Sequence, residues 1–125
     1  MASIETVLGP VDDSALGVTL SHEHVIVSSG DDIHHYPWLY DMDATHQRLV
    51  EELTEAKAGG IDSIIDLTTP DLGRDVEFVA GVARESGVNV VVATGIWRDV
   101  PRSMTLRDPD EIADIFVREI EIGID

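Results

Sequence analysis

The sequence has 125 residues, of which 43% are hydrophobic, and this size allows a single domain with a buried core. With 25 acidic and 8 basic residues, its formal net charge of −17 argues against nucleic acid and anionic membranes as partners, because both require a basic surface. No cysteine is present, so disulfides and thiolate metal sites are excluded, and a metal would be held by histidine, carboxylate or modified lysine. No window approaches the roughly 18 apolar residues of a membrane span, and residues 1–5 do not begin a secretory signal, so we expect a cytoplasmic protein.

The segment before the first long strand is expected to form a leading arm or hairpin. It covers residues 1–16, and the Gly9-Pro10 pair in its middle is a turn signal. Apolar residues precede this pair and an acidic cluster follows it, a pattern that fits either a short hairpin or an extended arm.

Residues 18–25 are predicted to form the first strand of the main sheet. Four residues alternate along it and would share one face: Val18, Leu20, His22 and His24. We expect the two apolar residues to fill a core and the two imidazoles to stand where the strand leaves that core. Neutral imidazole is the commonest metal ligand, and two imidazoles at this spacing can reach one ion. The alternative is that both are ordinary polar strand residues.

A long loop is expected at residues 28–45, which contain glycine, aspartate, proline and aromatic residues. Loops of this length inside a compact domain are usually functional or disordered. The adjacent His34 and His35 lie here, but neighbouring side chains diverge in most backbone conformations. We therefore do not expect these two histidines to bind a metal ion.

The rest of the chain alternates helices with strands. Helices are predicted over residues 44–58 and 75–86 and from residue 108 onward, where apolar residues recur at helical spacing. Strands are predicted over residues 61–68, a nearly continuous apolar run, and 88–93, a strongly β-branched run. Each strand is thus followed by a helix.

Three strands that alternate with three helices predict an α/β fold with a parallel sheet. The pattern leaves two architectures open: an open doubly wound sheet, and part of a (β/α)8 barrel. Both form their sites at the carboxyl ends of the strands. No glycine-rich phosphate motif follows a strand, which disfavours a nucleotide-binding open sheet. Four candidate residues fall at these strand ends: His22, His24, Asp66 and Trp97.

Three polar residues, Asp66, Arg74 and Asp75, are expected to have structural roles. Asp66 could be a ligand by its position, but it shares its parity with Ile64 and Thr68 and is expected to support the site or a loop through hydrogen bonds. Arg74 and Asp75 lie at the start of the second helix, where we expect an ion pair or a helix cap.

Several different short motifs are spread along nearly the whole chain. They are Leu16-Gly17-Val18-Thr19-Leu20, His22-Glu23-His24, Leu72-Gly73-Arg74-Asp75, Val92-Ala93-Thr94-Gly95-Ile96-Trp97 and Arg118-Glu119-Ile120. Together and in this order, they resemble the phosphotriesterase family of the amidohydrolase superfamily. The resemblance implies a (β/α)8 TIM barrel, a fold that usually takes about 250 residues. Residues 1–125 would then be the N-terminal part of a metal-dependent hydrolase barrel and hold its first three βα units, an incomplete barrel.

The resemblance also implies a binuclear metal centre, normally of zinc. His22 and His24 would bind one ion together with an aspartate on the eighth strand. Histidines on the fifth and sixth strands would bind the other ion, and a carboxylated lysine on the fourth strand and a hydroxide would bridge the two. All of these partners except the first pair would lie on strands beyond residue 125.

The implied reaction is hydrolysis of an ester bond in a small-molecule phosphotriester or lactone. Trp97 matches a position that family members place at the substrate pocket, although a packing residue at the barrel rim is an equal alternative. Arg98 departs from the apolar residue of the well-known organophosphate hydrolases, which leaves the substrate open. Full-length chains would form a homodimer.

Two other functions stay open at this point. The chain could be a truncated, non-catalytic remnant or interaction fragment of such an enzyme, because three parallel strands leave an unpaired edge that favours association. It could also be a complete small α/β binding module whose histidine pair is fortuitous.

Overall fold

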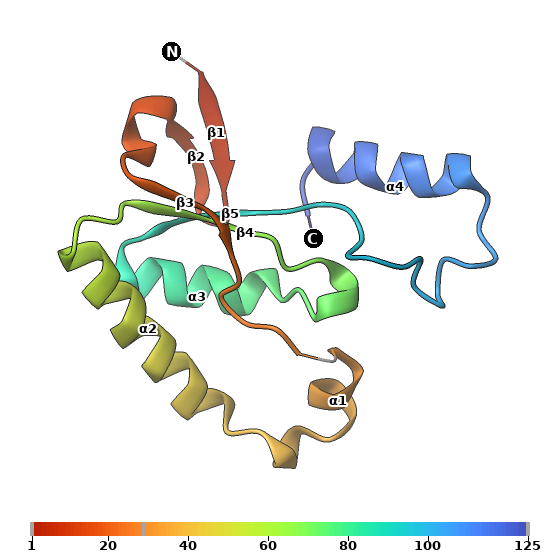
Figure 1. Cartoon of the computed structure of the whole chain (residues 1–125), viewed down its shortest axis with the longest axis horizontal. Coiled ribbons are helices and arrows are strands. Elements are labelled where there is room, and N and C mark those ends of the chain that lie inside the picture. Colours follow the sequence, from red (N-terminus) through yellow and green to blue (C-terminus); the bar gives the residue numbers. More distant parts are fainter. Residues whose placement is uncertain (1, 29, 125) are drawn as a thin grey trace.

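The computed structural model describes residues 2–28 and 30–124 of the chain (Figure 1). Its strands are β1 (Ser3–Thr6), β2 (Gly9–Asp12), β3 (Thr19–Glu23), β4 (Ser63–Asp66) and β5 (Asn89–Val92). Its α-helices are α1 (Gly30–His35), α2 (Met42–Ala58), α3 (Val76–Ser86) and α4 (Pro109–Glu121). Three short 3-10 turns complete the order: η1 (Asp13–Leu16), η2 (Pro37–Leu39) and η3 (Pro70–Leu72).

The strands β3, β4 and β5 form a parallel sheet in that order. Ile64 of β4 lies in register with Leu20 of β3 on one side and with Val90 of β5 on the other. The helices α2 and α3 connect these strands, because parallel neighbours require a crossover long enough to return the chain to the same edge. The predicted α/β fold with a three-stranded parallel sheet is confirmed.

The core lies on the face of the sheet that α2 and α3 cover. Ile64 and Val90 of the sheet belong to one buried cluster with Leu49 of α2 and Val82 of α3. Figure 1 shows the two helices on the same side of the sheet. Each such side chain contributes about 1.5–3 kcal/mol when it leaves water, so this layer is the main source of stability.

Aspartates begin three of the helices. Asp41 accepts a hydrogen bond from the Ala44 backbone N–H at the start of α2, and Asp75 accepts one from Phe78 at the start of α3. Asp108 opens α4 with a complete capping box. These caps satisfy N–H groups that have no partner inside the helix.

The prediction of a continuous loop over residues 28–45 is wrong. Residues 30–35 form α1, residues 37–39 form η2, and α2 begins at Met42, two residues earlier than predicted. The misleading signal was Pro37, which lies in the first turn of η2, where its missing N–H costs no hydrogen bond.

The predicted burial of Val18 and Leu20 is also wrong for the structure described. Val18 is 57% exposed and Leu20 is 38% exposed. Leu20 is in register with Ile64 of the core, but β3 is an edge of the described sheet, so Leu20 has a neighbouring strand on one side only. The pairing of β3 with β4 also shifts register between Leu20 and Glu23, and this irregularity interrupts the predicted alternation from Leu20 to His22.

The leading segment pairs as an antiparallel hairpin of β1 and β2, with Ile4 opposite Val11. The turn of this hairpin touches the outer edge of the main sheet, where the Val7 N–H donates to the Val90 carbonyl oxygen at 2.9 Å. The third parallel strand was expected to have an unpaired edge. That expectation needs correction at Val90, because the hairpin occupies the carbonyl group there.

The last helix packs little against the rest of the described chain. Figure 1 shows α4 beside the sheet, at the end of the long connection that follows β5. None of its residues is buried, and Ile120, which belongs to its apolar stripe, is 72% exposed. The helix is therefore set mainly by its capping box and sequence spacing, while its apolar stripe is only partly removed from water, with Ile112, Ile115 and Phe116 half-buried.

Candidate functional site

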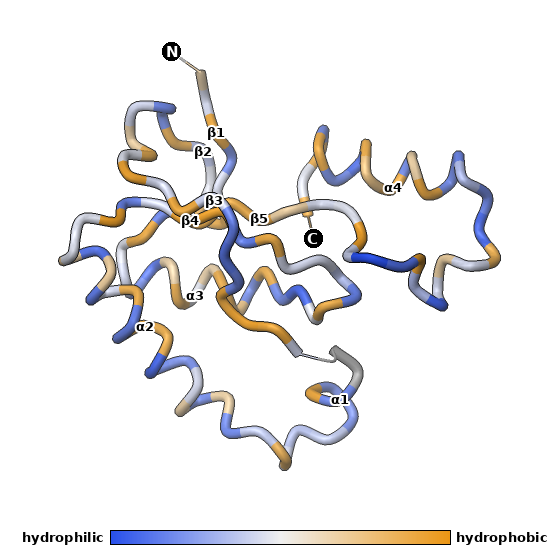
Figure 2. Tube along the Cα trace, viewed as in Figure 1, coloured by the Kyte–Doolittle hydropathy of each residue, from blue (hydrophilic) through white to orange (hydrophobic). Residues whose placement is uncertain are grey.

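The two histidines of the first parallel strand stand together at its carboxyl end. His22 is the fourth residue of β3 and His24 follows the strand directly. Their ring centroids are 6.0 Å apart with an interplanar angle of 70°, and both residues are exposed. Figure 2 shows this end of β3 as a hydrophilic stretch next to the apolar sheet. Two imidazoles are thus presented side by side to solvent.

A buried threonine orients His24. The His24 Nδ1 lies 3.0 Å from the Thr68 Oγ1, and the Thr68 hydroxyl is also 3.4 Å from the Ile26 carbonyl oxygen. In the tautomer with the proton on Nδ1, the hydroxyl donates to Ile26 and its oxygen accepts the Nδ1–H of His24. The Nε2 lone pair is then free for a ligand, an arrangement typical of metal-binding histidines.

Asp66 ties the ends of β3 and β4 together, as its parity predicted. The side chain is buried, with 1% exposure. One carboxylate oxygen accepts the Thr68 N–H at 2.8 Å and the other accepts the Val25 N–H at 3.4 Å. Asp66 therefore supports the segments that carry His24 and its threonine partner, and its own oxygens are occupied by backbone donors.

The donor set is incomplete within residues 2–28 and 30–124. No group of three His, Cys, Asp or Glu side chains gathers closely enough there to hold a metal ion. A catalytic zinc site typically has three protein ligands and a water. His22 and His24 fit two of these positions in chemistry and placement, and further ligands would have to come from outside this part of the chain.

Trp97 lies on the loop that follows β5, at the same end of the sheet as the two histidines. Its side chain is largely exposed, and the Arg98 guanidinium lies 5.3 Å from the ring centroid. The Trp97 backbone N–H lies within hydrogen-bond distance of both oxygens of Asp71, at 3.2 and 3.3 Å. The structure thus places Trp97 at the carboxyl end of the sheet, where its backbone is held by the Asp71 carboxylate of the neighbouring βα connection.

An ion pair anchors the base of this loop. Arg74 makes two hydrogen bonds to the Glu119 carboxylate, at 2.5 and 3.1 Å, and a third to the Ala93 carbonyl oxygen at 2.9 Å. The Thr94 hydroxyl also donates to Glu119. The hydrogen bonds from Arg74 hold the pKa of the Glu119 carboxyl below its ordinary value of 4.5, although burial opposes this shift. Arg74 therefore forms the expected ion pair, but with a residue of α4.

We expect Arg74→Met to lower the free energy of unfolding of the full-length protein by about 3 kcal/mol, because it leaves a nearly buried carboxylate without its partner. The Arg74 and Glu119 side chains are only 10% and 15% exposed. The matched control is Arg48→Met, since the Arg48–Glu52 pair is 68% and 62% exposed and its loss should cost less than about 0.5 kcal/mol. Urea denaturation measures both.

The effect of Arg74→Met should also depend on pH. The folded pKa of Glu119 lies below the unfolded one, so its stabilisation is fully present above the ordinary value of 4.5 and is lost as the pH falls through the lowered pKa. The stability difference between wild type and variant should therefore be constant near neutral pH and shrink below about pH 4. A difference that stays constant down to pH 3 would contradict this account of the pair.

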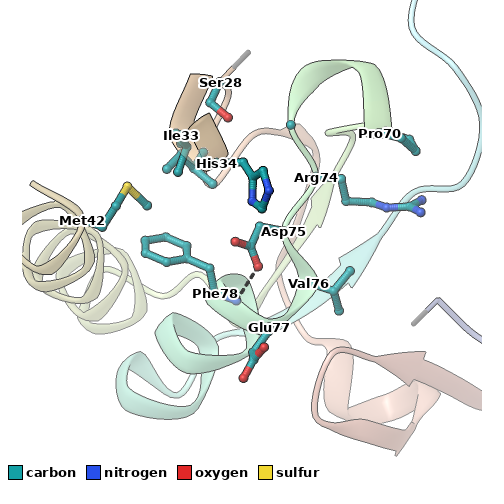
Figure 3. Close-up of a pocket in the computed structure, with 12 residues that line it drawn as sticks. Ser28, Ile33, His34, Met42, Pro70, Arg74, Asp75, Val76, Glu77 and Phe78 are labelled. Atoms are coloured by element: carbon teal, nitrogen blue, oxygen red, sulfur yellow. Dashed lines mark hydrogen bonds between the residues drawn. The ribbon is translucent and has the colours of Figure 1, made fainter. Parts of the chain in front are cut away.

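A cleft of about 610 Å³ lies away from the histidine pair, between α1 and the starts of α2 and α3. Figure 3 shows His34, Asp75 and Phe78 around it, with Asp75 engaged by the Phe78 backbone N–H. His34 and His35 lie on α1 with ring centroids 5.1 Å apart, and both are exposed. The sequence did not predict this cleft, because its walls come from three separate segments.

Two residues that belong to the site environment were not singled out from the sequence. Thr68 contacts His24 across 44 positions, and Asp71 contacts Trp97 across 26 positions. The available signal was weak: Asp71 lies in the Thr69-Pro70-Asp71 turn at a strand end, where polar side chains are common.

No helix in the described part of the chain is long and apolar enough to cross a membrane.

Comparison with known proteins gives a consistent picture. A model of the phosphotriesterase family matches residues 2–125. The chain is 40% identical to a phosphotriesterase homology protein of Mycobacterium tuberculosis, over 99% of this chain and 41% of that protein. It is 37% identical to an aryldialkylphosphatase of Saccharolobus solfataricus, over 91% and 37% of the two chains. An N-acetyltaurine hydrolase of Bos taurus is 28% identical, over 98% and 43%. The chain thus spans about two fifths of the length of these relatives.

Proposed function

Since the chain belongs to the phosphotriesterase family, we propose that residues 1–125 are the N-terminal part of a zinc-dependent hydrolase that cleaves the ester bond of a phosphotriester or a lactone. The observation that carries this proposal is the pair His22 and His24 at the carboxyl end of β3, with the Nδ1 of His24 in contact with Thr68. The site would be a binuclear centre completed by strands that follow residue 125. Residues 1–16 would serve as the leading hairpin of the barrel.

His22 and His24 would hold one of two divalent cations through neutral imidazole nitrogens. Such a pair of cations, when bound, polarises the P=O or C=O group under attack and makes a strong nucleophile available at neutral pH. Thr68 would orient the His24 ring through its hydroxyl, and Asp66 holds Thr68 through its backbone N–H. Trp97 would provide part of the wall against which the substrate lies.

The partner is proposed to be a small-molecule ester or lactone, with no role for nucleic acid or membrane. The net charge of −17 supports this choice, because it would repel polyanionic surfaces. We further propose a cytoplasmic enzyme that forms a homodimer at full length. Among the similar proteins, the name aryldialkylphosphatase supports a phosphotriester substrate, whereas N-acetyltaurine hydrolase is named for an amide.

Metal removal tests the proposed activity. The full-length protein should hydrolyse an aryl dialkyl phosphate or a lactone, lose this activity after dialysis against a chelator, and regain it with added zinc. Elemental analysis should find about two metal ions per chain in the active form and almost none after dialysis. An N-acylated aminosulfonate, in which the bond to be cleaved is an amide, serves as the comparison substrate. Turnover that survives complete metal removal would contradict the proposal.

The coding sequence after Asp125 separates the hydrolase from the non-catalytic remnant. An in-frame continuation that carries a strand with a lysine, and later strand-end histidines and an aspartate, supports the hydrolase. A stop codon directly after Asp125 supports the remnant. The same observation tests the small binding module, because a continuation of this kind would give the histidine pair its missing partners.

A further inference from the structure

We propose that Asp71 is a positioning residue that holds Trp97 at the rim of the substrate site and thereby favours substrates with a flat aromatic group. The inference rests on the proposed function, because it takes Trp97 to contact the substrate. It concerns a carboxylate that does not touch the reacting atoms and belongs to the turn η3, one connection away from the loop that it holds.

The carboxylate of Asp71 is fixed on its own side before it meets Trp97. The Thr69 hydroxyl donates to one of its oxygens at 2.6 Å, and Thr69 itself is only 6% exposed. The turn η3 follows β4 directly and contains Pro70, which limits the backbone angles of the turn. Asp71 therefore presents its oxygens from a well-ordered position at the carboxyl end of the sheet.

The contact reaches across to the backbone of the next connection. The Trp97 N–H lies 3.2 Å from one oxygen of Asp71 and 3.3 Å from the other, so the bond is shared between them. A hydrogen bond to an ionised acceptor is roughly twice as strong as one between neutral groups. Because the bond engages the backbone, it fixes where the Trp97 side chain leaves the loop.

The indole ring needs such an anchor because little else surrounds it. The Trp97 side chain is 61% exposed, and the Arg98 guanidinium that lies over its ring is itself largely exposed. The turns further along this loop are closed by its own atoms, for example the bond from the Met104 N–H to the Pro101 carbonyl oxygen. A ring that is already oriented binds a partner at lower entropic cost than a mobile one.

The chemistry of the rim indicates the class of substrate that benefits. An indole ring offers a flat π surface that stacks with aromatic groups, and such pairs contribute beyond the buried area alone. An ester with an aryl leaving group would use this surface, whereas an ester with only small alkyl groups would gain little from it. Asp71 should therefore influence the choice between the two substrates more than the rate of bond cleavage itself.

The test compares Asp71→Ala, Asp71→Asn and the control Asp114→Ala in the full-length, metal-loaded protein. Asp114 is an exposed acidic residue of α4, so its replacement gives the same change of charge. In Asp71→Ala, hydrogen exchange of the peptide that contains the Trp97 amide should become about tenfold faster, because its charged acceptor is lost. Asp71→Asn retains an oxygen acceptor and should restore most of the protection.

The kinetic measurement uses an aryl ester and an alkyl ester of the same acid. In Asp71→Ala, kcat/KM should fall about tenfold for the aryl ester, mainly through KM, and less than about twofold for the alkyl ester. Equal losses for both esters would overturn the inference, as they would mean that Asp71 only stabilises the fold. Unchanged hydrogen exchange at Trp97 would also overturn it.

The two proposals fail in different ways. If the wild-type protein hydrolyses none of the esters, the proposed function fails, yet the exchange measurement still shows whether Asp71 holds Trp97. If the wild-type protein is active and Asp71→Ala matches Asp114→Ala in both readouts, only the inference about Asp71 fails.

Discussion

His22→Ala in the full-length protein is expected to remove the metal ion that His22 and His24 share and to reduce hydrolysis to background. Two imidazoles at the end of β3 would supply half of a four-coordinate site, and one imidazole alone binds far more weakly. Enzymes accelerate their reactions by about 10⁶-fold or more, so loss of the metal should cost several orders of magnitude in kcat/KM. Zinc content by elemental analysis and steady-state kinetics measure the two effects separately.

The matched controls for this experiment are His34→Ala and His35→Ala. These histidines are as exposed as His22 but lie on α1, outside the strand ends. Both variants should keep the metal content and turnover of the wild type. Near wild-type zinc content and turnover in His22→Ala would refute the assignment of the pair, and a large loss in either control would show that α1 contributes to the site.

Residues 1–125 expressed alone should show no significant hydrolysis of esters or lactones and should self-associate. The described residues contain no third metal ligand near the histidine pair, so the fragment should bind zinc weakly at best. Its edge strand exposes Leu20 and the preceding Val18, and Ile120 of α4 and the following Ile122 are also exposed. Apolar surface of this kind promotes association, although the contact of Val7 with Val90 shields part of the sheet edge.

Light scattering after size exclusion measures association, and titration calorimetry measures zinc binding. The paired change Val18→Ser with Leu20→Ser should reduce association of the fragment if the exposed apolar side chains at the β3 edge drive it. Leu8→Ser is the control, because Leu8 is 50% exposed on the turn of the hairpin. A monomeric fragment that unfolds cooperatively, binds zinc stoichiometrically and turns over substrate would overturn the expectation, since residues 1–125 would then contain a whole site.

Much of the architecture follows from local sequence alone. The strand β4 is almost wholly buried, and its apolar run needs no partner to be recognised as the centre of a parallel sheet. The helices α2, α3 and α4 carry their own start signals in Asp41, Asp75 and Asp108, so their existence and approximate bounds could be predicted. The pairing of His22 with His24 is likewise local, because only one residue separates them along a strand.

The tertiary structure decided what depends on distant parts of the chain. Thr68 orients His24 and Glu119 pairs with Arg74 across 44 and 45 positions, and no pattern within a short window encodes such contacts. The same holds for the exposure of Val18 and Leu20, because burial depends on what lies against a strand, and a register shift in β3 interrupts the alternation that the sequence predicted. Sequence spacing therefore determined the main strands and helices and the candidate ligands, but not α1. Their surroundings were decided only in the folded chain, because packing and hydrogen bonding join segments that the sequence keeps apart.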